Sequence, residues 1–589
     1  MSQLDRQVLP GIAASPGIAV GPVIVYDRVA VPIGRRRVAA EDVEREVSRL
    51  ISGVEAARRE VQALRDGIGD DAHADHRLLL DAQLTMHGDE LLLSSSVKLL
   101  RDQRINAEWA LRRTVEDIGA RLRGASERYF RERADDVEHV GEHILRVLTG
   151  VSRSMPAIDE PTILVAADLS PAEAAQLSGR LVLALVTGAG SPSSHTAILA
   201  RALKIPAVVG VSEVTRLVGP GETLVVDALR GEVVLHPTDE EVEQARARRA
   251  RFTAFEDKLR ESARGRGETR DGERVALMAN VELEADVGAI ERGEVDGVGL
   301  YRTEYLYLDR LEPPSEEEQL GVYARVAKRA APRPITFRTF DLGADKMPLG
   351  AKRGPNPSLG LRALRIDWER PELLVTQLRA LLRASVFGNV QVMFPMVSSV
   401  GDLRRAKVLM RRAREDLDAA GLAYGPIPLG SMLEVPSAII MADRLAPECD
   451  FFSLGTNDLT QYTLAIDRQD PRVAHLARPL DPAILRLIDR ALAVAREWDK
   501  PISACGDLAA DPVALPILVG MGYRTFSMPL GAVPLAQEII SRIDLPNATA
   551  LAKDALACDD ARDVEELVVE RFGAELGELW EGQGIELPR

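Results

Sequence analysis

The second half of the chain repeats one rhythm, in which a short apolar segment is followed by a helical stretch. From about residue 270 onward eight strand candidates follow one another, most of them separated by helical sequence: RVALMANVE, GVGLYRTEY, PITFRTFDLG, VQVMFPMVS, PLGSMLEVP, FFSLGTNDLT, PISACGDLA and YRTFSMPLG. Eight strand–helix units over about 300 residues are typical of a TIM barrel. We therefore expect residues 269–575 to form a (β/α)8 barrel.

Polar side chains stand at the C-terminal ends of these strand candidates. The seven residues are Asn280, Arg302, Arg338, Glu434, Asn457, Asp458 and Cys505. In a TIM barrel the loops at this end of the strands hold the active site. Each residue alone could be a solvated loop residue or a member of a structural ion pair. Seven of them at one rim indicate a binding site instead.

Arginines at this rim indicate the kind of ligand. The guanidinium groups of Arg302, Arg338 and Arg362 are suited to bidentate contacts with carboxylate or phosphate oxygens. Arg468, in the segment LAIDRQD after the sixth strand, could join them. The sequence therefore predicts a small, multiply charged anion, and a phosphorylated carboxylic acid would fit.

Two carboxylates and a thiol complete the predicted rim. Glu434 and Asp458 are hard oxygen donors on adjacent strands, and with water and substrate oxygens they would suit Mg²⁺. The sequence has no cluster of cysteine and histidine ligands that suggests zinc. Cys505, in SACGDLAAD, is either inert packing, as a buried cysteine in a barrel usually is, or a proton donor to the ligand.

The first half of the chain consists of several segments that differ in composition and in hydrophobic pattern. Short strands at the start are followed by a long block rich in Ala, Leu, Arg and Glu with helical spacing. Strands and short helices then return in the same style as the first strands, which predicts that the helical block is inserted into one small α/β domain. The charged run that follows reads as a solvated connecting helix. The predicted parts are 1–29 with 150–237 (α/β domain), 30–149 (helical insertion), 238–268 (linker) and 269–575 (barrel).

One of the eight histidines, His195, stands at the head of an apolar helix in GSPSSHTAILARALKIPAVVG. We expect this helix to start near Ser193, with Pro192 close to its first turn. Unpaired N–H groups and the helix dipole would favour a phosphate there, and a neutral imidazole is a competent nucleophile. A lone histidine at a helix start is, however, more often structural. Ser170, in ADLSPAEAAQL, is read mainly as a helix cap, and alternatively as a group that orients His195.

The net charge, the cysteine content and the apolar segments of the chain argue against several classes of function. The formal net charge of −16 argues against nonspecific nucleic-acid binding and permits a basic protein partner. The three cysteines are far apart and form no CxxC pair, which favours a reducing, cytoplasmic location. No apolar run approaches the roughly 18 residues of a membrane span. Prolines and glycines break up the apolar start, so we expect no signal peptide and no membrane insertion.

A series of short motifs, in a fixed order along the chain, resembles a known protein family. The motifs are ASPGIAVG at 14–21, ILVAADLSP, SSHTAILARAL, GVGLYRTEYLYLDR, FRTFDLGADK, NPSLGLRALR, MFPM, MLEVPSA, DFFSLGTNDLTQYTLAIDR and ACGDLAAD. Nearly end to end, the chain resembles enzyme I of the bacterial phosphoenolpyruvate-dependent sugar phosphotransferase system. The stretch FFSLGTNDLTQYTLA is the most specific of these motifs.

The resemblance implies a role for each candidate residue. It implies that His195 is the phosphorylated residue and that Cys505 protonates the enolate carbon, so that pyruvate leaves. It further implies a phosphoenolpyruvate site that is made by Arg302, Arg338, Arg468 and the backbone at Asn457. Glu434 and Asp458 are implied to bind Mg²⁺.

The resemblance also implies partners and a motion. The helical block resembles the docking subdomain for the histidine-containing phosphocarrier protein HPr, with a contact face that includes residues 81–90. The family forms a homodimer through the barrel domain, and its members act in the cytoplasm. Because His195 must meet phosphoenolpyruvate and then HPr, the family mechanism requires the histidine domain to swivel. The linker 238–268 is the predicted hinge region.

The loop before His195 departs from the family pattern. The family usually has two glycines there, whereas this chain has Gly190 followed by Ser191. A glycine can be needed for a close approach of the backbone, so the exchange bears on the shape of this loop. Ser193 can replace a threonine hydroxyl that is usual in the family.

Other functions are weighed against this one. Phosphoenolpyruvate synthase and pyruvate phosphate dikinase share the histidine domain and the barrel, but they need an ATP-binding domain of several hundred residues. A nitrogen-related paralogue would carry an N-terminal sensory domain. Neither is expected, since the chain starts directly at the ASPGIA strand. A non-catalytic regulator should have lost His195, Glu434, Asp458 or Cys505, and all four are present.

Overall fold

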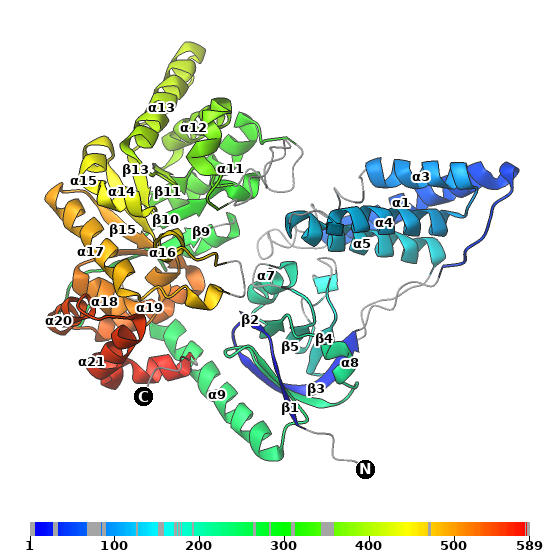
Figure 1. Ribbon diagram of the computed structural model, residues 1–589, viewed down its shortest axis with the longest axis horizontal. Coiled ribbons are helices and arrows are strands. Elements are labelled where there is room, and N and C mark those ends of the chain that lie inside the picture. Colours follow the sequence, from blue (N-terminus) through cyan, green and yellow to red (C-terminus); the bar gives the residue numbers. More distant parts are fainter. Residues whose placement is uncertain are drawn as a thin grey trace. The chain divides into compact units, whose positions relative to one another are not determined.

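The structure is a computed structural model of the 589-residue chain, and it divides into two compact units, Met1–Ala254 and Phe255–Arg589 (Figure 1). The structure describes residues 6–26, 33–66, 84, 87, 90–124, 128–150, 158–169, 173–174, 177, 180–190, 194–262, 267–281, 284–307, 312–342, 358–468, 473–583 and 585.

The first unit contains an eight-stranded sheet with the strand order β1-β8-β7-β3-β4-β5-β6-β2. Strands β3 to β6 run parallel in the order β3-β4-β5-β6, and the pairs at the two ends of the sheet are antiparallel. The strands are β1 (Gln7–Pro10), β2 (Ile12–Ser15), β3 (Ile18–Tyr26), β4 (Thr162–Ala166), β5 (Val182–Thr187), β6 (Ala207–Val209), β7 (Thr223–Asp227) and β8 (Glu232–Leu235).

Alternation along β4 and β5 places an apolar core on each face of the sheet. Ile163 and Val165 face one core, and Leu164 faces the other, because successive side chains of a strand point to opposite faces. Helix α7 (His195–Ala202) packs Ala197 and Leu199 into the core of Leu164, and α8 (Val214–Leu217) contributes Val214 to the opposite core. The two-sided burial explains the continuously apolar strand sequences.

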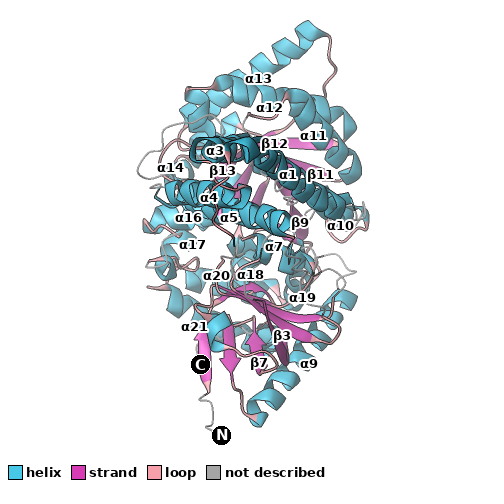
Figure 2. Cartoon of the chain, turned by 90° about the vertical axis from the view of Figure 1, so that its right-hand side faces the viewer, coloured by secondary structure: helices cyan, strands magenta, loops and turns pink. Residues whose placement is uncertain are grey.

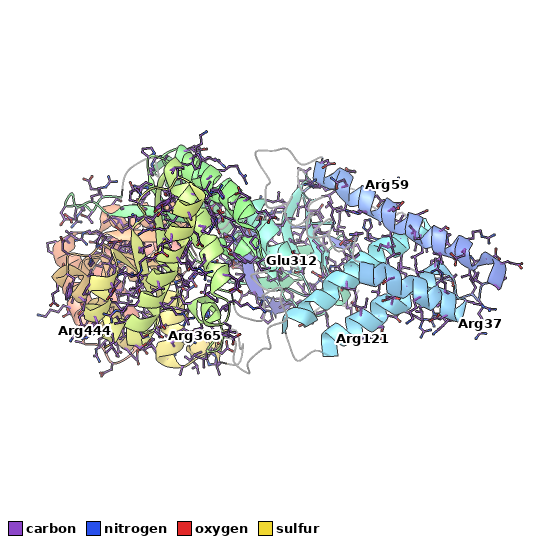
Figure 3. All side chains as sticks on the ribbon, turned by 90° about the horizontal axis from the view of Figure 1, so that it is seen from above. Arg37, Arg59, Arg121, Glu312, Arg365 and Arg444 are labelled. Atoms are coloured by element: carbon purple, nitrogen blue, oxygen red, sulfur yellow. The ribbon has the colours of Figure 1, made fainter. Side chains whose placement is uncertain are left out.

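The residues between β3 and β4 form a helical subdomain, as predicted. Its helices are α1 (Val43–Asp66), α3 (Glu90–Gln103), α4 (Ala107–Gly124) and α5 (Arg128–Thr149). Leu50, Leu111 and Ile144 are almost fully buried between them. Charged side chains such as Arg59 and Arg121 are exposed on the outside (Figure 3). The apolar stripe and charged outer face of each helix are what their periodic sequences predict.

Helix α9 (Asp239–Ser262) is the predicted connecting helix, but it is not solvated all round. Ala245 is fully buried in a cluster with Ile18 and Val225 of the sheet. Arg248 Nη1 lies 2.6 Å from Asp227 Oδ2, and the side chain of Asp227 is only 4% exposed. An apolar residue and an ion pair within this charged run therefore attach the helix to the first unit.

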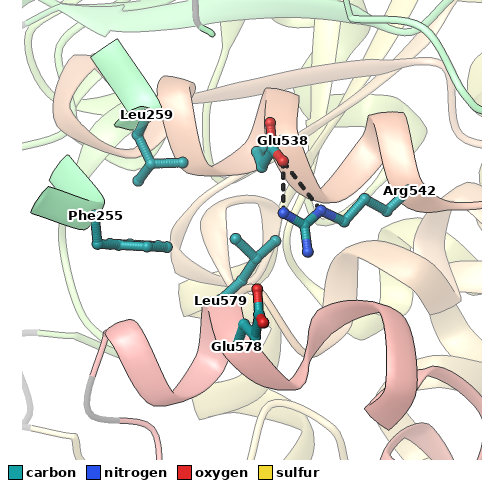
Figure 4. Close-up of a pocket in the computed structure, with 6 residues that line it drawn as sticks. All are labelled: Phe255, Leu259, Glu538, Arg542, Glu578 and Leu579. Atoms are coloured by element: carbon teal, nitrogen blue, oxygen red, sulfur yellow. Dashed lines mark hydrogen bonds and ion pairs between the residues drawn. The ribbon is translucent and has the colours of Figure 1, made fainter. Parts of the chain in front are cut away.

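The C-terminal end of α9 belongs to the second unit. Phe255 and Leu259 line a small pocket against α19 (Val533–Arg542) and α21 (Ala561–Gly582) (Figure 4). In this pocket Arg542 donates hydrogen bonds of 3.0 and 2.7 Å to Glu538, and a third of 2.8 Å to the carbonyl of Glu575. The division between the two units thus falls inside one helix.

The second unit is a closed barrel of eight parallel strands (Figures 1 and 2). The strands are β9 (Ala276–Val281), β10 (Val298–Arg302), β11 (Pro334–Arg338), β12 (Asn389–Phe394), β13 (Leu429–Leu433), β14 (Phe451–Gly455), β15 (Ile502–Cys505) and β16 (Thr525–Pro529). The prediction of a TIM barrel is confirmed.

Helices surround this barrel. They are α10 (Gly288–Glu291), α11 (Glu316–Ala330), α12 (Pro371–Ala384), α13 (Val400–Ala420), α14 (Pro436–Ile440), α15 (Ala442–Leu445), α16 (Thr456–Leu464), α17 (Pro482–Glu497), α18 (Ala514–Met521), α19, α20 (Leu545–Ala555) and α21. Several begin with a capping box, for example at Ser315, where the hydroxyl accepts the N–H of Glu318. No helix in the described part of the chain is both long and apolar enough to cross a membrane.

Several strand candidates extend past the C-terminal ends of the observed strands, and FFSLGTNDLT is the clearest case. The segment FFSLGTNDLT ends its strand at Gly455, and α16 begins at Thr456. Thr460 donates its hydroxyl to the carbonyl of Thr456, one turn earlier in this helix, at 2.9 Å. The polar half of the segment is therefore the first turn of a helix, which brings Asn457 and Asp458 over the end of the barrel.

Candidate active site

The C-terminal end of the barrel gathers the side chains that the sequence singled out. Arg302 and Arg338 are the last residues of two adjacent strands and lie opposite each other in the register. Glu434 directly follows β13, Asp458 lies in the first turn of α16, and Cys505 ends β15. All five belong to the same rim of one unit.

Arg338 is held by carboxylates on both sides. Its Nη2 donates to Glu304 Oε1 at 2.9 Å, and its Nη1 lies 3.4 Å from Asp341 Oδ2. The side chain is only 13% exposed. Burial lowers the pKa of Arg338, but nearby carboxylates, above all Glu304, outweigh this effect and raise it. The guanidinium is therefore a fixed positive charge at the rim, with its direction set before any ligand arrives.

Arg362 comes from outside the strands but belongs to the same cluster. It makes a bidentate ion pair with Asp341, with Nε–Oδ1 and Nη2–Oδ2 distances of 2.9 and 2.7 Å. Its Nη1 donates to the hydroxyl of Tyr462 at 3.1 Å, and its Nη2 lies 3.4 Å from Asp458 Oδ2. Burial raises the pKa of Asp341, but Arg362 and Arg338 hold it below its ordinary value. Asp341 is thus the ionised group that positions two arginines.

Glu434 and Asp458 place two buried carboxyl groups beside each other. Glu434 is 2% exposed, and its Oε1 accepts the N–H of Met396 at 2.6 Å. Burial, together with the charges of Asp458 and Asp341, raises the pKa of Glu434 to about 8. A side chain on Gly455 would place its Cβ 2.8 Å from Glu434 Oε2, so glycine at this strand end leaves room for the carboxylate.

The chemistry of this carboxylate pair fits a divalent cation. Asp458 Oδ1 is buried and accepts no hydrogen bond from the described residues, although Arg468 Nη2 lies 3.8 Å away. A cation would offset the repulsion that raises the pKa of Glu434. In the described part of the chain no three or more His, Cys, Asp or Glu side chains form a set that could hold a metal ion. Water and substrate oxygens would therefore have to complete the coordination.

Cys505 lies at the bottom of the rim and is 1% exposed. Its Sγ lies 3.1 Å from the carbonyl oxygen of Leu454, and the hydroxyl of Ser453 donates to the sulfur at 3.4 Å. Burial raises the pKa of the thiol to about 11. At neutral pH the group is therefore a protonated thiol, which can give up a proton but is a poor nucleophile.

Asn457 is fixed by the loop that follows Cys505. Its Oδ1 accepts the N–H of Asp507 at 2.7 Å, and the intervening Gly506 has a φ of +92°. A Cβ at Gly506 would come within 2.4 Å of Thr456 Oγ1. Asn457 is the second residue of α16, and the unpaired backbone N–H groups of a first helical turn are suited to bind an anion. The seventh predicted rim residue, Asn280, accepts a 2.6 Å hydrogen bond from Ser527.

His195 is the first residue of α7 in the other unit. The helix starts two residues later than the predicted Ser193, because Ser194 is extended and caps it, accepting the N–H of Ala197 at 3.3 Å. Gly190, with a φ of +119°, has the left-handed conformation that favours glycine. The side chain of His195, and residues Ser170, Ser191, Pro192 and Ser193, lie outside the described residues.

Sequence reasoning missed three groups of the barrel site. Asp341 and Glu304 hold the arginines, and Tyr462 donates its hydroxyl to the carbonyl of Ser358 while accepting from Arg362. Asp341 lies three residues after Arg338 in FRTFDLG, and Glu304 two after Arg302 in YRTEY. Carboxylates this close to binding arginines are the signal that could have identified them.

Comparisons with known proteins agree along the whole chain. Models of the phosphoenolpyruvate-utilising enzymes match residues 10–133 (N-terminal), 158–231 (mobile domain) and 256–545 (phosphoenolpyruvate-binding domain). Phosphoenolpyruvate-protein phosphotransferases of Listeria innocua and Listeria monocytogenes are 38% and 39% identical to this chain, over 96% of it and 99% of their own lengths. The chain belongs to this family. The resemblance drawn from the motifs is confirmed, and the chain is an enzyme of the phosphotransferase class.

A phosphoenolpyruvate-protein phosphotransferase of Geobacillus stearothermophilus is 38% identical over 97% of this chain and 99% of its own length. The match therefore includes both units and the helical subdomain, rather than the barrel alone. A barrel shared by chance with an unrelated enzyme would not produce a match of this extent.

Proposed function

We propose that this enzyme I family member transfers the phosphoryl group of phosphoenolpyruvate to His195, releases pyruvate, and passes the phosphoryl group on to HPr. The observation that carries the proposal is the rim of the barrel. Buried arginines, a crowded carboxylate pair and a protonated buried thiol meet there, and a small phosphorylated carboxylic acid needs all three.

The arginines would bind the substrate. Arg302 and Arg338, on adjacent strands, would contact the phosphate, since guanidinium groups bind its oxygens in pairs. Arg468, whose side chain is 41% exposed, would close over the phosphate from the loop after α16. The backbone N–H groups near Asn457 would add donors from the N-terminal turn of this helix.

Glu434 and Asp458 would hold Mg²⁺. Both carboxyl groups are buried, and together they supply the hard oxygen ligands that this ion prefers. The bound ion would neutralise negative charge on the substrate oxygens. Arg362 lies 3.4 Å from Asp458 and would keep that carboxylate in place beside the substrate.

The residues account for each change of bonding in the first half-reaction. A lone pair on a ring nitrogen of His195 forms the N–P bond, and the P–O bond to the substrate breaks. The electron pair released on that oxygen makes the enolate of pyruvate. The Cys505 thiol then gives its proton to the methylene carbon, which yields pyruvate and a thiolate that regains a proton from solvent.

The second half-reaction needs a protein acceptor. The helical subdomain would bind HPr, and most of it lies within the part of the chain that matches the N-terminal model of the phosphoenolpyruvate-utilising enzymes. Most of the predicted contact segment 81–90 lies outside the described residues. We further propose that the barrel forms a homodimer and that the first unit swivels between the two partners.

A relay assay tests this function. The enzyme is mixed with Mg²⁺, phosphoenolpyruvate and HPr, and both pyruvate and phosphorylated HPr are measured. We expect equal amounts of the two products, and neither product with His195→Ala. Pyruvate formed without phosphorylated HPr would show hydrolysis instead of a relay. A partner-binding regulator without catalysis would bind HPr but leave phosphoenolpyruvate unchanged.

A further inference from the structure

A second histidine, His139, connects the helical subdomain to the turn that follows β4, and this turn contacts the helix of His195. His139, on α5, places its Nε2 3.3 Å from Oδ2 of Asp168, just after β4. The two side chains are 13% and 32% exposed. The Nδ1 atom of His139 is buried and has no hydrogen-bond partner among the described residues. The polar contact of this imidazole is therefore the one with Asp168.

Asp168 is in turn connected to the helix that carries His195. Its Oδ1 accepts the N–H of Leu169 at 2.8 Å, and the carbonyl of Leu169 accepts the hydroxyl of Thr196 at 3.4 Å. Leu169 is 2% exposed and lies in the same apolar core as Ala197 of α7. A short series of contacts thus leads from His139 to the first turn of α7, next to His195.

A separate contact of α5 supports the same segment further along. Arg146 lies 3.7 Å from Glu173, which also accepts a 2.8 Å hydrogen bond from the hydroxyl of Tyr26 at the end of β3. This pair joins α5 to the sheet, whereas the pair of His139 and Asp168 joins it to the turn that contacts α7. Helix α5 therefore contacts this part of the first unit at two places, Asp168 and Glu173.

We propose that His139 is a positioning residue for phosphoryl transfer. Through Asp168 and Leu169 it holds the first turn of α7, and so the backbone of His195, in the position from which the imidazole receives and donates the phosphoryl group. The proposal rests on the proposed function, in which His195 is the acceptor. His139 contacts no reacting atom in this account. Loss of His139 should slow phosphoryl transfer, because a misplacement of about 1 Å at a reacting group can slow a reaction by about 10²-fold.

The same helix provides a matched control. His143 is 14% exposed, close to the value for His139. Its Nδ1 lies 3.0 Å from Nε2 of His87 and its Nε2 lies 3.0 Å from Glu60, so these contacts stay within the helical subdomain. Replacement of His143 therefore disturbs the helical packing without touching the turn at Asp168.

Single-turnover kinetics tests the proposal. Labelled phosphoenolpyruvate is mixed with wild type, His139→Ala, His139→Gln and His143→Ala, and the rate of phosphohistidine formation is followed, with thermal midpoints as a check of folding. We expect His139→Ala to lower the maximal rate about tenfold or more, within the range that misplacement produces. The phosphoenolpyruvate concentration for half-maximal rate should not change, because this ligand binds the other unit.

The remaining variants distinguish positioning from stability. His139→Gln keeps a donor at the place of Nε2 and should recover most of the rate, and His143→Ala should react within about twofold of wild type. Asp168→Asn alone should lower the rate of phosphohistidine formation. In the His139→Ala background it should lower the rate little further, since both substitutions remove the same contact. A wild-type rate for His139→Ala, or equal losses in both alanine variants, would overturn the proposal. If wild type carries no label at His195, the proposed function itself fails.

Discussion

Burial determines the charge and protonation state of single side chains in the barrel site. Cys505 has little exposure and burial raises its thiol pKa to about 11, so in the proposed mechanism it enters the reaction as an acid. Cys505→Ala should slow pyruvate formation by about 10² to 10⁴-fold, the usual contribution of a general acid. The measurement is pyruvate release under saturating phosphoenolpyruvate. Cys558→Ala, a substitution of a partly exposed cysteine outside the site, should leave the rate unchanged.

The ion pair of Asp341 with Arg362 is a second prediction at this scale. Asp341→Asn leaves a buried guanidinium without its bidentate partner, which should destabilise the barrel by about 3 kcal/mol. Glu566→Gln is the control, because it removes an exposed ion pair with Arg562 and should cost less than about 1 kcal/mol. Urea unfolding of both variants measures the difference. Equal effects would mean that Asp341 does not balance a buried charge.

Metal removal tests the carboxylate pair. An ion that binds only the folded barrel at about 100 times its Kd stabilises it by ~2.7 kcal/mol. Mg²⁺ should therefore raise the thermal midpoint of wild type, and a chelator should reverse the increase. Glu434→Gln should abolish this response, while Asp443→Asn, at an exposed carboxylate, should keep it. A full response in Glu434→Gln would place the ion elsewhere.

At the scale of elements, the turn after β15 sets the first turn of α16. Gly506 has a φ of +92° and has Thr456 and Asn457 packed against it. Gly506→Ala should cost about 2 kcal/mol and lower the rate, because strain at such a position amounts to about 1–3 kcal/mol. Gly531→Ala is the control, since no atom lies within 4 Å of its added Cβ. Comparison of unfolding free energies and pyruvate release checks both outcomes.

The elements also show what the sequence could and could not predict. Eight apolar segments with polar ends were enough to predict the barrel and its rim, because strand period and strand count determine this architecture. The start of α7 was misplaced by two residues, since either Ser193 or Ser194 could serve as the cap. The pairing of Asp341 with Arg362 was missed because the two residues are distant in the sequence, although the short spacing between Asp341 and Arg338 was visible there. Pairing of this kind depends on tertiary packing.

At the scale of the whole molecule, the proposed mechanism requires the first unit to change its position. His195 belongs to one unit and the phosphoenolpyruvate rim to the other. We expect at least two arrangements of residues 1–237 relative to the barrel, with proportions that shift when substrate and Mg²⁺ are added. Solution scattering or paired spectroscopic labels on the two units would detect the shift. Distances that never change with substrate would contradict a swivelling mechanism.

The most direct test of the central claim is transfer of labelled phosphorus to His195. Wild type and His195→Ala are incubated with Mg²⁺ and phosphoenolpyruvate that carries a radioactive phosphoryl group. The account predicts label on wild type that is labile in acid and stable in base, and no label on the variant. Label on a folded His195→Ala protein, or none on wild type, would contradict the claim that this histidine accepts the phosphoryl group.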